Sequence, residues 1–335
     1  MKLSIVAYHY VRELRRSRFP RLKGLETEHF KEQIAYIKGH YQVISGEELL
    51  AAAETDSWDM LPPSALLLTF DDGYVDHFTD VFPILLRANI PGCFFPPARC
   101  VLDNHVLDVN KIHFILASVP DKQIIVDQIF GMLEEYRSQY EIYGRDYYWT
   151  KLAAAGRFDP REIIFIKRLL QRELPEELRG MIVDRLFQKY VSSDEACFAR
   201  GLYMSVEQIV NMRDGGMFFG CHGHSHDWMD SLGAAGQKHD VELGLEFLKR
   251  IGSRVDGWIM SYPHGAYDEC LLAILRSAGC QIGLTTNLGI AELGRDDLLA
   301  LPRLDTNDLP KQGNAAPNEW TLQAKGCVVS NSTQS

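Results

Sequence analysis

The sequence lacks paired cysteines, a long apolar run and an excess of basic charge. Its seven cysteines are an odd number and include no CxxC pair, which argues against a disulfide framework or a cysteine-rich zinc site. No apolar run approaches the roughly 18–20 residues that a membrane span needs. With a formal net charge of −10, the chain lacks the overall positive charge typical of proteins that bind nucleic acid or anionic membranes. We therefore expect no nucleic acid partner and no membrane span.

The first residues also lack the features of a signal peptide. The apolar stretch within residues 1–9 is short and contains no small-residue cleavage site, so it is more typical of a first β-strand. Together with the cysteine pattern, this predicts a reduced, cytoplasmic location.

What the sequence does contain is an alternation of short apolar segments and amphipathic helical patterns. Repeated β–α units favour a parallel sheet or barrel. Seven or eight strands would suit an α/β fold with a closed or nearly closed barrel. The segments that we expect to form strands are residues 3–8, 43–44, 65–70, 92–95, 217–221, 258–261, 282–286 and 298–301.

The middle of the chain interrupts this alternation. Residues 111–200 carry mainly helical, highly charged patterns, which predicts a helical insertion in a barrel that spans residues 1–310. The insertion could serve as a lid, as a subunit contact in a homo-oligomer or as a substrate platform, or it could be a solvated cap without chemistry. Residues 311–335 are polar, and we expect a loose tail there.

Two adjacent carboxylates follow the most apolar of the expected strands. The segment Leu-Leu-Leu-Thr-Phe leads directly into Asp71, Asp72 and Gly73. Neighbouring side chains in a strand point to opposite faces, so the two carboxylates converge only if the chain turns, which Gly73 permits. A buried pair of carboxylates needs a cation or a shared proton. The alternative is an Asp pair that caps the next helix.

A histidine-rich segment follows a second strand. His222 and His226 are four residues apart, which would place them on one face of a helical turn, a common spacing for two ligands of one zinc ion. His224 would then point away. A barrel collects residues from its strand ends on one rim, so Asp and His residues could share one metal. The alternative is a His-rich surface loop.

Two further loops follow later strands. Pro263 and Gly265 flank His264, and this pattern favours a tight loop whose backbone N–H groups can face a ligand; it could also be a simple connector. Arg303 and Asp305 belong to a charged cluster after the last strand, which could hold an ion pair behind the site or form an exposed turn.

In this order, these segments resemble the polysaccharide deacetylase proteins (NodB-homology, carbohydrate esterase family 4). The resemblance covers residues 1–110 and 201–310 and leaves the insertion and the tail unexplained. In the third of its motifs His264 replaces a tyrosine. The segments that carry it are Thr-Phe-Asp-Asp-Gly-Tyr at 69–74, His-Gly-His-Ser-His at 222–226, Tyr-Pro-His-Gly at 262–265 and Tyr-His-Tyr-Val at 8–11.

The resemblance implies a distorted (β/α) barrel of about seven strands. It also implies that Asp72, His222 and His226 bind a divalent metal, most often zinc, and that Asp71 is the general base that takes a proton from the water that the metal holds. The backbone N–H of His264 would face the oxyanion. The residues that we expect to contact the substrate or the oxyanion, or to support these groups, are Tyr74, Pro263, Arg303 and Asp305.

Two departures from the family pattern concern proton transfer. Many members have an arginine that orients the base at the position of Ser261, and here Arg303 could replace it. Many members also have a C-terminal histidine as general acid, but no histidine follows His264. We therefore expect His264, or as a second choice His9, to be the general acid. The alternative is a route in which Asp71 returns its proton to the leaving amine.

By this resemblance the substrate is an acetamido sugar that loses its N-acetyl group. A cytoplasmic enzyme would meet a nucleotide- or lipid-linked precursor of a surface polysaccharide. The alternatives are an O-acetyl esterase or another amide hydrolase on the same fold, and a catalytically silent carbohydrate-binding homologue. The last is disfavoured because a silent site has no need of a base beside its metal ligands.

Overall fold

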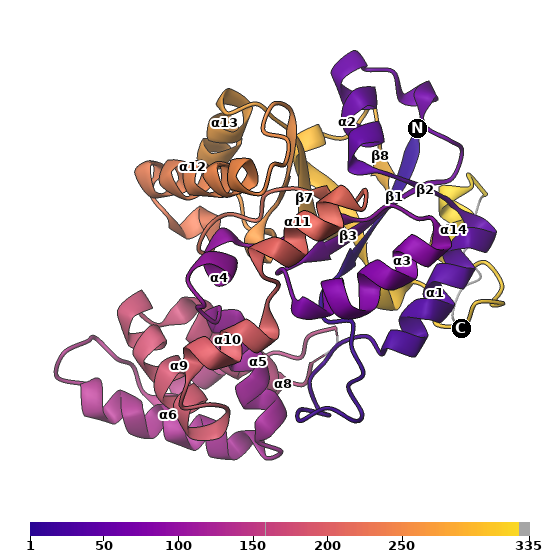
Figure 1. Ribbon diagram of the computed structural model, residues 1–335. Helices are drawn as coiled ribbons and strands as arrows, with labels where there is room; N and C mark the ends of the chain where they lie inside the picture. Colours follow the sequence, from indigo (N-terminus) through magenta and orange to yellow (C-terminus); the bar gives the residue numbers. More distant parts are fainter. Residues whose placement is uncertain (158, 328–335) are drawn as a thin grey trace. The chain divides into compact units, whose positions relative to one another are not determined.

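The computed structural model describes residues 1–157 and 159–327 (Figure 1). The chain divides into two units. The first contains residues 1–13, 24–105 and the chain from 200 onward, and the second contains residues 14–23 and 106–199.

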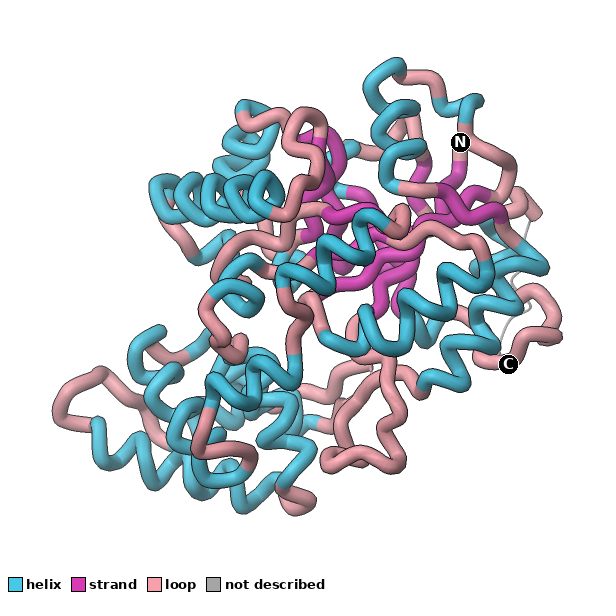
Figure 2. Tube along the Cα trace, viewed as in Figure 1, coloured by secondary structure: helices cyan, strands magenta, loops and turns pink. Residues whose placement is uncertain are grey.

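The first unit is built on a parallel sheet whose strand order is β5-β4-β3-β1-β9-β7-β6. The two ends of this series meet, because Cys221, just after β5, pairs in parallel with Met260 of β6. Helices surround the strands (Figure 2). The predicted distorted (β/α) barrel of about seven strands is confirmed. Its strands are β1 (Lys2–Tyr8), β3 (Ala65–Asp71), β4 (Cys93–Phe95), β5 (Phe218–Phe219), β6 (Trp258–Ser261), β7 (Cys280–Leu288) and β9 (Leu301–Asp305).

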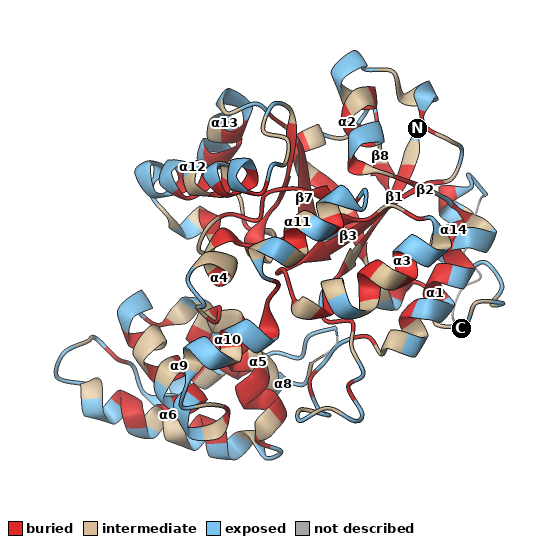
Figure 3. Cartoon of the chain, in the orientation of Figure 1, coloured by how far each residue is buried: buried red, intermediate tan, exposed pale blue. Residues whose placement is uncertain are grey.

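Two short strands complete the sheet. β2 (Gln42–Ile44) pairs with the first half of β3, whereas β4 pairs with the second half. β8 (Ala291–Glu292) is antiparallel to β1. β3 therefore contacts three parallel neighbours, which explains why all seven of its residues are buried (Figure 3) and why its sequence is a continuous apolar run.

Alternation along the strands separates two layers of the core. Leu66, Leu68 and Phe70 of β3 pack in the larger cluster with the surrounding helices. Leu67 packs in a second cluster with residues of the other strands. Because the side-chain period of a strand is two residues, Asp71 at the end of β3 lies on the same face as Leu67.

Helices of the first unit begin where the sequence provides caps. The side chains of Ser45 and Ser205 each accept a hydrogen bond from the third helical residue in a capping box, as their patterns predict. The helices of this unit are α1 (Thr27–His40), α2 (Gly46–Thr55), α3 (Phe82–Ala88), α4 (Ala98–Leu102), α11 (Val206–Asp214), α12 (Ala234–Arg250), α13 (Glu269–Ser277) and α14 (Glu319–Ala324).

Two expectations for the end of the chain are wrong. Residues 298–300 form a 3₁₀ turn, in which the side chain of Asp297 accepts a hydrogen bond from the backbone N–H of Leu299, so the last strand begins only at Leu301. The expected loose tail includes helix α14, whose Thr321 is buried and lies 2.7 Å from the hydroxyl of Tyr36. The remaining part of that tail, 328–335, lies outside the described residues.

The second unit is helical. Its boundaries differ from the expected 111–200, because it begins at Val106 and also includes residues 14–23. Lys111 is buried, and its Nζ lies 2.6 Å from a carboxylate oxygen of Asp184 and 3.1 Å from one of Glu195. Its helices are α5 (Asp108–Ser118), α6 (Lys122–Tyr136), α7 (Arg145–Leu152), α8 (Arg161–Arg168), α9 (Glu176–Tyr190) and the start of α10 (Glu195–Leu202).

The segment 14–23 is held to this unit by arginines. Arg18 donates to the carbonyl of Val191 and Arg21 to that of Ala117, and both carbonyls lie at helix C-termini, where cations are favoured. In both contacts the two residues lie far apart in the sequence, so no local pattern predicts them. In the described parts of both units, no helix is long and apolar enough to cross a bilayer.

Candidate metal centre and base

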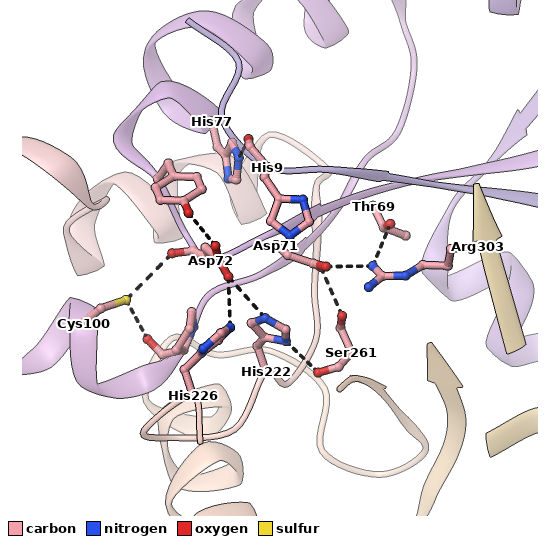
Figure 4. Close-up of polar contacts among 12 residues, drawn as sticks. His9, Thr69, Asp71, Asp72, His77, Cys100, His222, His226, Ser261 and Arg303 are labelled. Carbon is pink, nitrogen blue, oxygen red and sulfur yellow. Dashed lines mark hydrogen bonds and ion pairs between the residues drawn. The ribbon is translucent and has the colours of Figure 1, made fainter. Parts of the chain in front are cut away.

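Two carboxylates leave the end of β3 in different directions (Figure 4). Asp71 is the last strand residue, whereas Asp72 and Gly73 adopt left-handed conformations with φ of +69° and +67°. This conformation is costly for a non-glycine residue such as Asp72. The turn that Gly73 was expected to permit is present, but it lets the adjacent carboxylates face different groups and does not make them converge.

Asp72, His222 and His226 form a buried cluster. Oδ1 of Asp72 lies 3.4 Å from Nε2 of His222 and 3.3 Å from Nε2 of His226. One donor atom from each residue lies within 4.8 Å of the other two. These are the three residues that the family resemblance implies as ligands of one metal.

The donor atoms of this cluster suit a divalent cation. Oδ1 of Asp72 is buried without a hydrogen-bond partner in the described part of the chain. Oδ2 accepts a hydrogen bond from the hydroxyl of Tyr74 at 2.5 Å. Nδ1 of His222 lies 2.6 Å from the carbonyl oxygen of Ser261, which can only accept, so Nδ1 carries the proton and the lone pair of Nε2 faces Asp72. Two imidazole nitrogens and a carboxylate oxygen are ligands that zinc accepts.

The electrostatics of the cluster also favour a positive charge. Burial alone disfavours the imidazolium of His222, but the neighbouring carboxylates of Asp72 and Asp71 raise the pKa of its ring. Burial alone would raise the pKa of Asp72, but the two histidines hold it well below its ordinary value. The carboxylate is therefore ionised at neutral pH.

The histidine segment is a loop and not the expected helical turn. Gly223 and His226 have φ of +68° and +62°, which breaks helical geometry. Asp240 of α12 holds the loop, because its carboxylate accepts the backbone N–H groups of His224 and Ser225, both at 2.9 Å. The loop that carries His222 and His226 is therefore shaped by a side chain 14 residues beyond His226, which no local pattern indicates.

Asp71 is paired with a cation. Its Oδ2 lies 2.8 Å from Nη1 of Arg303, and its Oδ1 accepts a hydrogen bond from the hydroxyl of Ser261 at 3.1 Å. Nε of Arg303 donates to the carbonyl of Thr285 at 2.7 Å. Leu301 belongs to the same strand-lined cluster as Leu67, so alternation along β9 turns the Arg303 side chain toward Asp71.

The protonation state of Asp71 follows from these contacts. Burial alone would raise its pKa, but the charges of Arg303, His222 and His9 together hold the pKa below its ordinary value. Asp71 is therefore a carboxylate at neutral pH, as a general base must be. Arg303 thus lies beside Asp71, where it could replace the family's arginine that orients the base.

The two candidate proton donors lie in different surroundings. His9 follows β1, and the last pair of the β1–β3 register is Tyr8 with Phe70, so the register itself places His9 next to Asp71. Its side chain is exposed, and its ring lies beside Asp71 (Figure 4).

His264 lies at the second position of a 3₁₀ turn, with φ of +58°, after the buried Pro263. Its ring is stacked on Trp228, with centroids 4.4 Å apart and planes at 6°, and it meets the ring of His226 edge-on at 4.6 Å. The loop therefore reaches His226 of the cluster, and the His264 imidazole packs between the rings of Trp228 and His226.

Asp305 does not join the site. Its side chain accepts the backbone N–H of Asn307 and caps the turn at Thr306–Asp308. Of the two interpretations of this charged cluster, the turn applies to Asp305 and the ion pair behind the site applies to Arg303, which pairs with Asp71. The sequence did not reveal the roles of Asp240, which holds the histidine loop, and of Trp228, which stacks on His264, because their partners are close only in the folded chain.

Replacement of Arg303 by Met is expected to move the acid limb of the pH–rate profile to higher pH. The guanidinium opposes the effect of burial on the pKa of Asp71, so its loss raises that pKa and protonates the base at a pH where the wild type is active. The measurement is kcat/KM against pH on metal-loaded protein. R303K, which keeps the charge, should move the limb less, and an unmoved limb in R303M would show that Arg303 does not set the ionisation of Asp71.

The same variant has a predictable effect on stability. The lowered pKa of Asp71 means that its carboxylate contributes stability above its unfolded pKa, about 3.9, and that this contribution is lost as the pH falls through the lower folded pKa. Breaking a buried pair costs about 3–5 kcal/mol. The deficit of R303M in urea unfolding should therefore be largest near neutral pH and shrink in acid.

Comparisons with known proteins agree with this site and fold. Residues 186–283 match the polysaccharide deacetylase family model, a range that includes His222, His226 and Pro263. Poly-beta-1,6-N-acetyl-D-glucosamine N-deacetylase of Escherichia coli (strain K12) is 35% identical over 77 residues, which are 23% of this chain and 11% of that protein. The matched part is thus about a tenth of that relative.

Solved structures share the fold at low sequence identity. The Streptococcus pyogenes deacetylase PplD superposes with a TM-score of 0.57 at 16% identity, covering 97% of this chain and 98% of that one. IcaB from Ammonifex degensii superposes with a TM-score of 0.52 at 19% identity, covering 97% of both chains. These likenesses show the fold, and the match of residues 186–283 to the family model agrees with the resemblance found in the sequence motifs.

Proposed function

Because residues 186–283 match the polysaccharide deacetylase family model, we propose that this chain is a metal-dependent hydrolase that removes the N-acetyl group of an acetamido sugar. The observation that supports the proposal most strongly is that two adjacent carboxylates have different partners. Asp72 faces two imidazole nitrogens, whereas Asp71 is ionised beside Arg303. A ligand set beside an ionised base is what hydrolysis of an amide requires.

Each side chain has a distinct task in this proposal. A zinc or similar divalent ion held by Asp72, His222 and His226 would supply a Lewis acid for the acetyl carbonyl and lower the pKa of a water. Asp71 accepts the proton of the attacking water, and Arg303 and Ser261 hold its carboxylate in place. The turn at 263–265 offers backbone N–H groups to the developing oxyanion.

The leaving amine needs a proton, because an amide anion is a very poor leaving group. We propose that His9 supplies it. Three facts support His9 over His264. The register of β1 and β3 places His9 beside Asp71, and His9 is exposed. The ring of His264, in contrast, is stacked on Trp228. Imidazole is a common general acid in enzymes.

His9→Gln is expected to abolish the alkaline limb of the pH–rate profile while metal content stays unchanged. A general acid must be protonated to act, so activity falls above its pKa, and a variant without the acid loses that dependence. His264→Gln is the matched variant and should keep the limb. Loss of the limb in H264Q alone would assign the acid to His264, and two unchanged profiles would favour return of the proton by Asp71.

The substrate class is tested by acetate release. The E. coli relative is named for a polymer of N-acetylglucosamine, whereas the sequence analysis favoured a nucleotide- or lipid-linked precursor. Zinc-loaded protein should release acetate from an N-acetylhexosamine in at least one of three forms: UDP-linked, lipid-linked, or a β-1,6-linked oligomer. Release from O-acetyl sugars alone would identify an esterase. Metal binding without any release would favour a silent carbohydrate-binding protein.

A further inference from the structure

His77 is a buried imidazole behind the candidate site. It begins a π-helical turn, His77–Val81, five residues after Asp72. Its side chain is fully buried, and its ring centroid lies 5.6 Å from that of Phe70, 5.6 Å from that of Tyr74 and 5.7 Å from that of Phe94. Burial lowers its pKa to about 4, so the ring is neutral near pH 7.

Only one of the two ring nitrogens has a hydrogen-bond partner in the described part of the chain. Nε2 of His77 lies 2.9 Å from the carbonyl oxygen of His9. A carbonyl only accepts, so Nε2 carries the proton and donates it. Nδ1 is buried without a partner, which is unfavourable. An aromatic ring without nitrogen would pack among the same neighbours at lower cost, so packing does not account for an imidazole here.

The carbonyl that accepts this hydrogen bond belongs to His9, which directly follows the end of β1. β1 ends at Tyr8, and its pairing with β3 ends there too. His9 is the next residue, and its ring lies beside Asp71 (Figure 4). The hydrogen bond from His77 therefore fixes the peptide at the point where the chain leaves the strand, and π-helical turns often occur at functional sites.

We propose that His77 is a positioning residue for His9. Its Nε2–H holds the His9 carbonyl, and this contact sets the direction in which the His9 imidazole leaves the main chain toward Asp71. The inference rests on the proposed function only for the role of His9 as proton donor; the contact itself is independent of any activity.

Two substitutions separate the hydrogen bond from the packing. His77→Phe fills the aromatic surroundings but cannot donate, whereas the side-chain amide of His77→Gln can donate to the same carbonyl. We expect H77F to lower kcat by about 10–100-fold, with KM and bound zinc unchanged, and to weaken the alkaline limb of the pH profile as H9Q does. H77Q should recover most of the loss. Phe94→Leu, which alters the same packing without touching the hydrogen bond, should leave the profile in place.

A double variant adds a readout that a purely structural role would not move. If His77 acts through His9, the losses of H77F and H9Q are strongly non-additive, so that H77F/H9Q is hardly slower than H9Q. Full additivity, or a wild-type rate and profile in H77F, would overturn the inference.

An activity-free measurement keeps the inference separate from the proposed function. The ¹⁵N resonances of wild-type His77 should show the neutral Nε2–H tautomer, and the His9 ring resonances should shift in H77F and return toward wild type in H77Q. Unchanged His9 resonances in folded H77F would overturn the positioning role. Absence of acetate release from every substrate in the wild type would contradict the proposed function alone.

Discussion

Asp71→Asn is expected to lower acetate release by about 10²–10⁴-fold, the usual effect of removing a general base. Asparagine keeps the shape and can still accept a hydrogen bond from Ser261, but it can neither take a proton from water nor carry the charge that Arg303 faces. Metal content should stay close to one equivalent, because Asp71 is not among the three clustered donor residues. Rates with the preferred sugar and elemental analysis of the same sample are the measurements.

The matched control for this variant is Asp305→Asn. Asp305 lies at the end of β9 and caps a turn, and asparagine is an equally good cap, so D305N should keep both rate and fold. A D71N enzyme within a few fold of wild type would mean that another group takes the proton. Loss of metal in D71N would mean that this carboxylate helps to hold the ion.

His226→Gln is expected to abolish metal binding and, with it, activity. Without this ring only Asp72 and His222 remain of the clustered donors, and two protein ligands hold zinc poorly compared with the three of catalytic sites. Asp72→Asn should act in the same direction, because it removes the negative charge that faces both imidazoles. Isothermal titration with zinc, after treatment with a chelator, measures the loss.

His224→Gln is the control from the same loop. His224 is bound to Asp240 through its backbone N–H, a contact that glutamine retains, and its side chain lies outside the cluster. H224Q should therefore bind zinc like the wild type. Zinc at 100 times its dissociation constant should stabilise wild type and H224Q by about 2.7 kcal/mol and leave H226Q unchanged. Equal stabilisation of H226Q would place the metal elsewhere.

The sequence predicted the barrel and a cluster of Asp and His side chains because both depend on local patterns, whereas the choice of Asp72 over Asp71 came from the family resemblance. Apolar runs ending in Asp71-Asp72 and before His222 mark strands that end in polar groups, and a parallel barrel brings such ends to one rim. Gly73 indicated a turn at the end of the strand, although the expected convergence of the two carboxylates was wrong. These features are visible within a few residues of the site.

The parts that the sequence could not predict depend on distant partners. The four-residue spacing of His222 and His226 suggested a helical turn, yet Asp240 and a left-handed Gly223 shape a loop that also brings the rings together. The position of Arg303 beside Asp71 depends on alternation along β9, and the expected strand at 298–301 ended where β9 begins. A correct strand assignment would have pointed to Arg303.

The most direct test of the account is a zinc-edge anomalous difference map from crystals of zinc-loaded protein. The account predicts a single strong peak within about 2.0–2.2 Å of Oδ1 of Asp72 and of Nε2 of both His222 and His226, with Asp71 still paired with Arg303 and not bound to the ion. No peak at these atoms under saturating zinc, or a peak held by other residues, would contradict it.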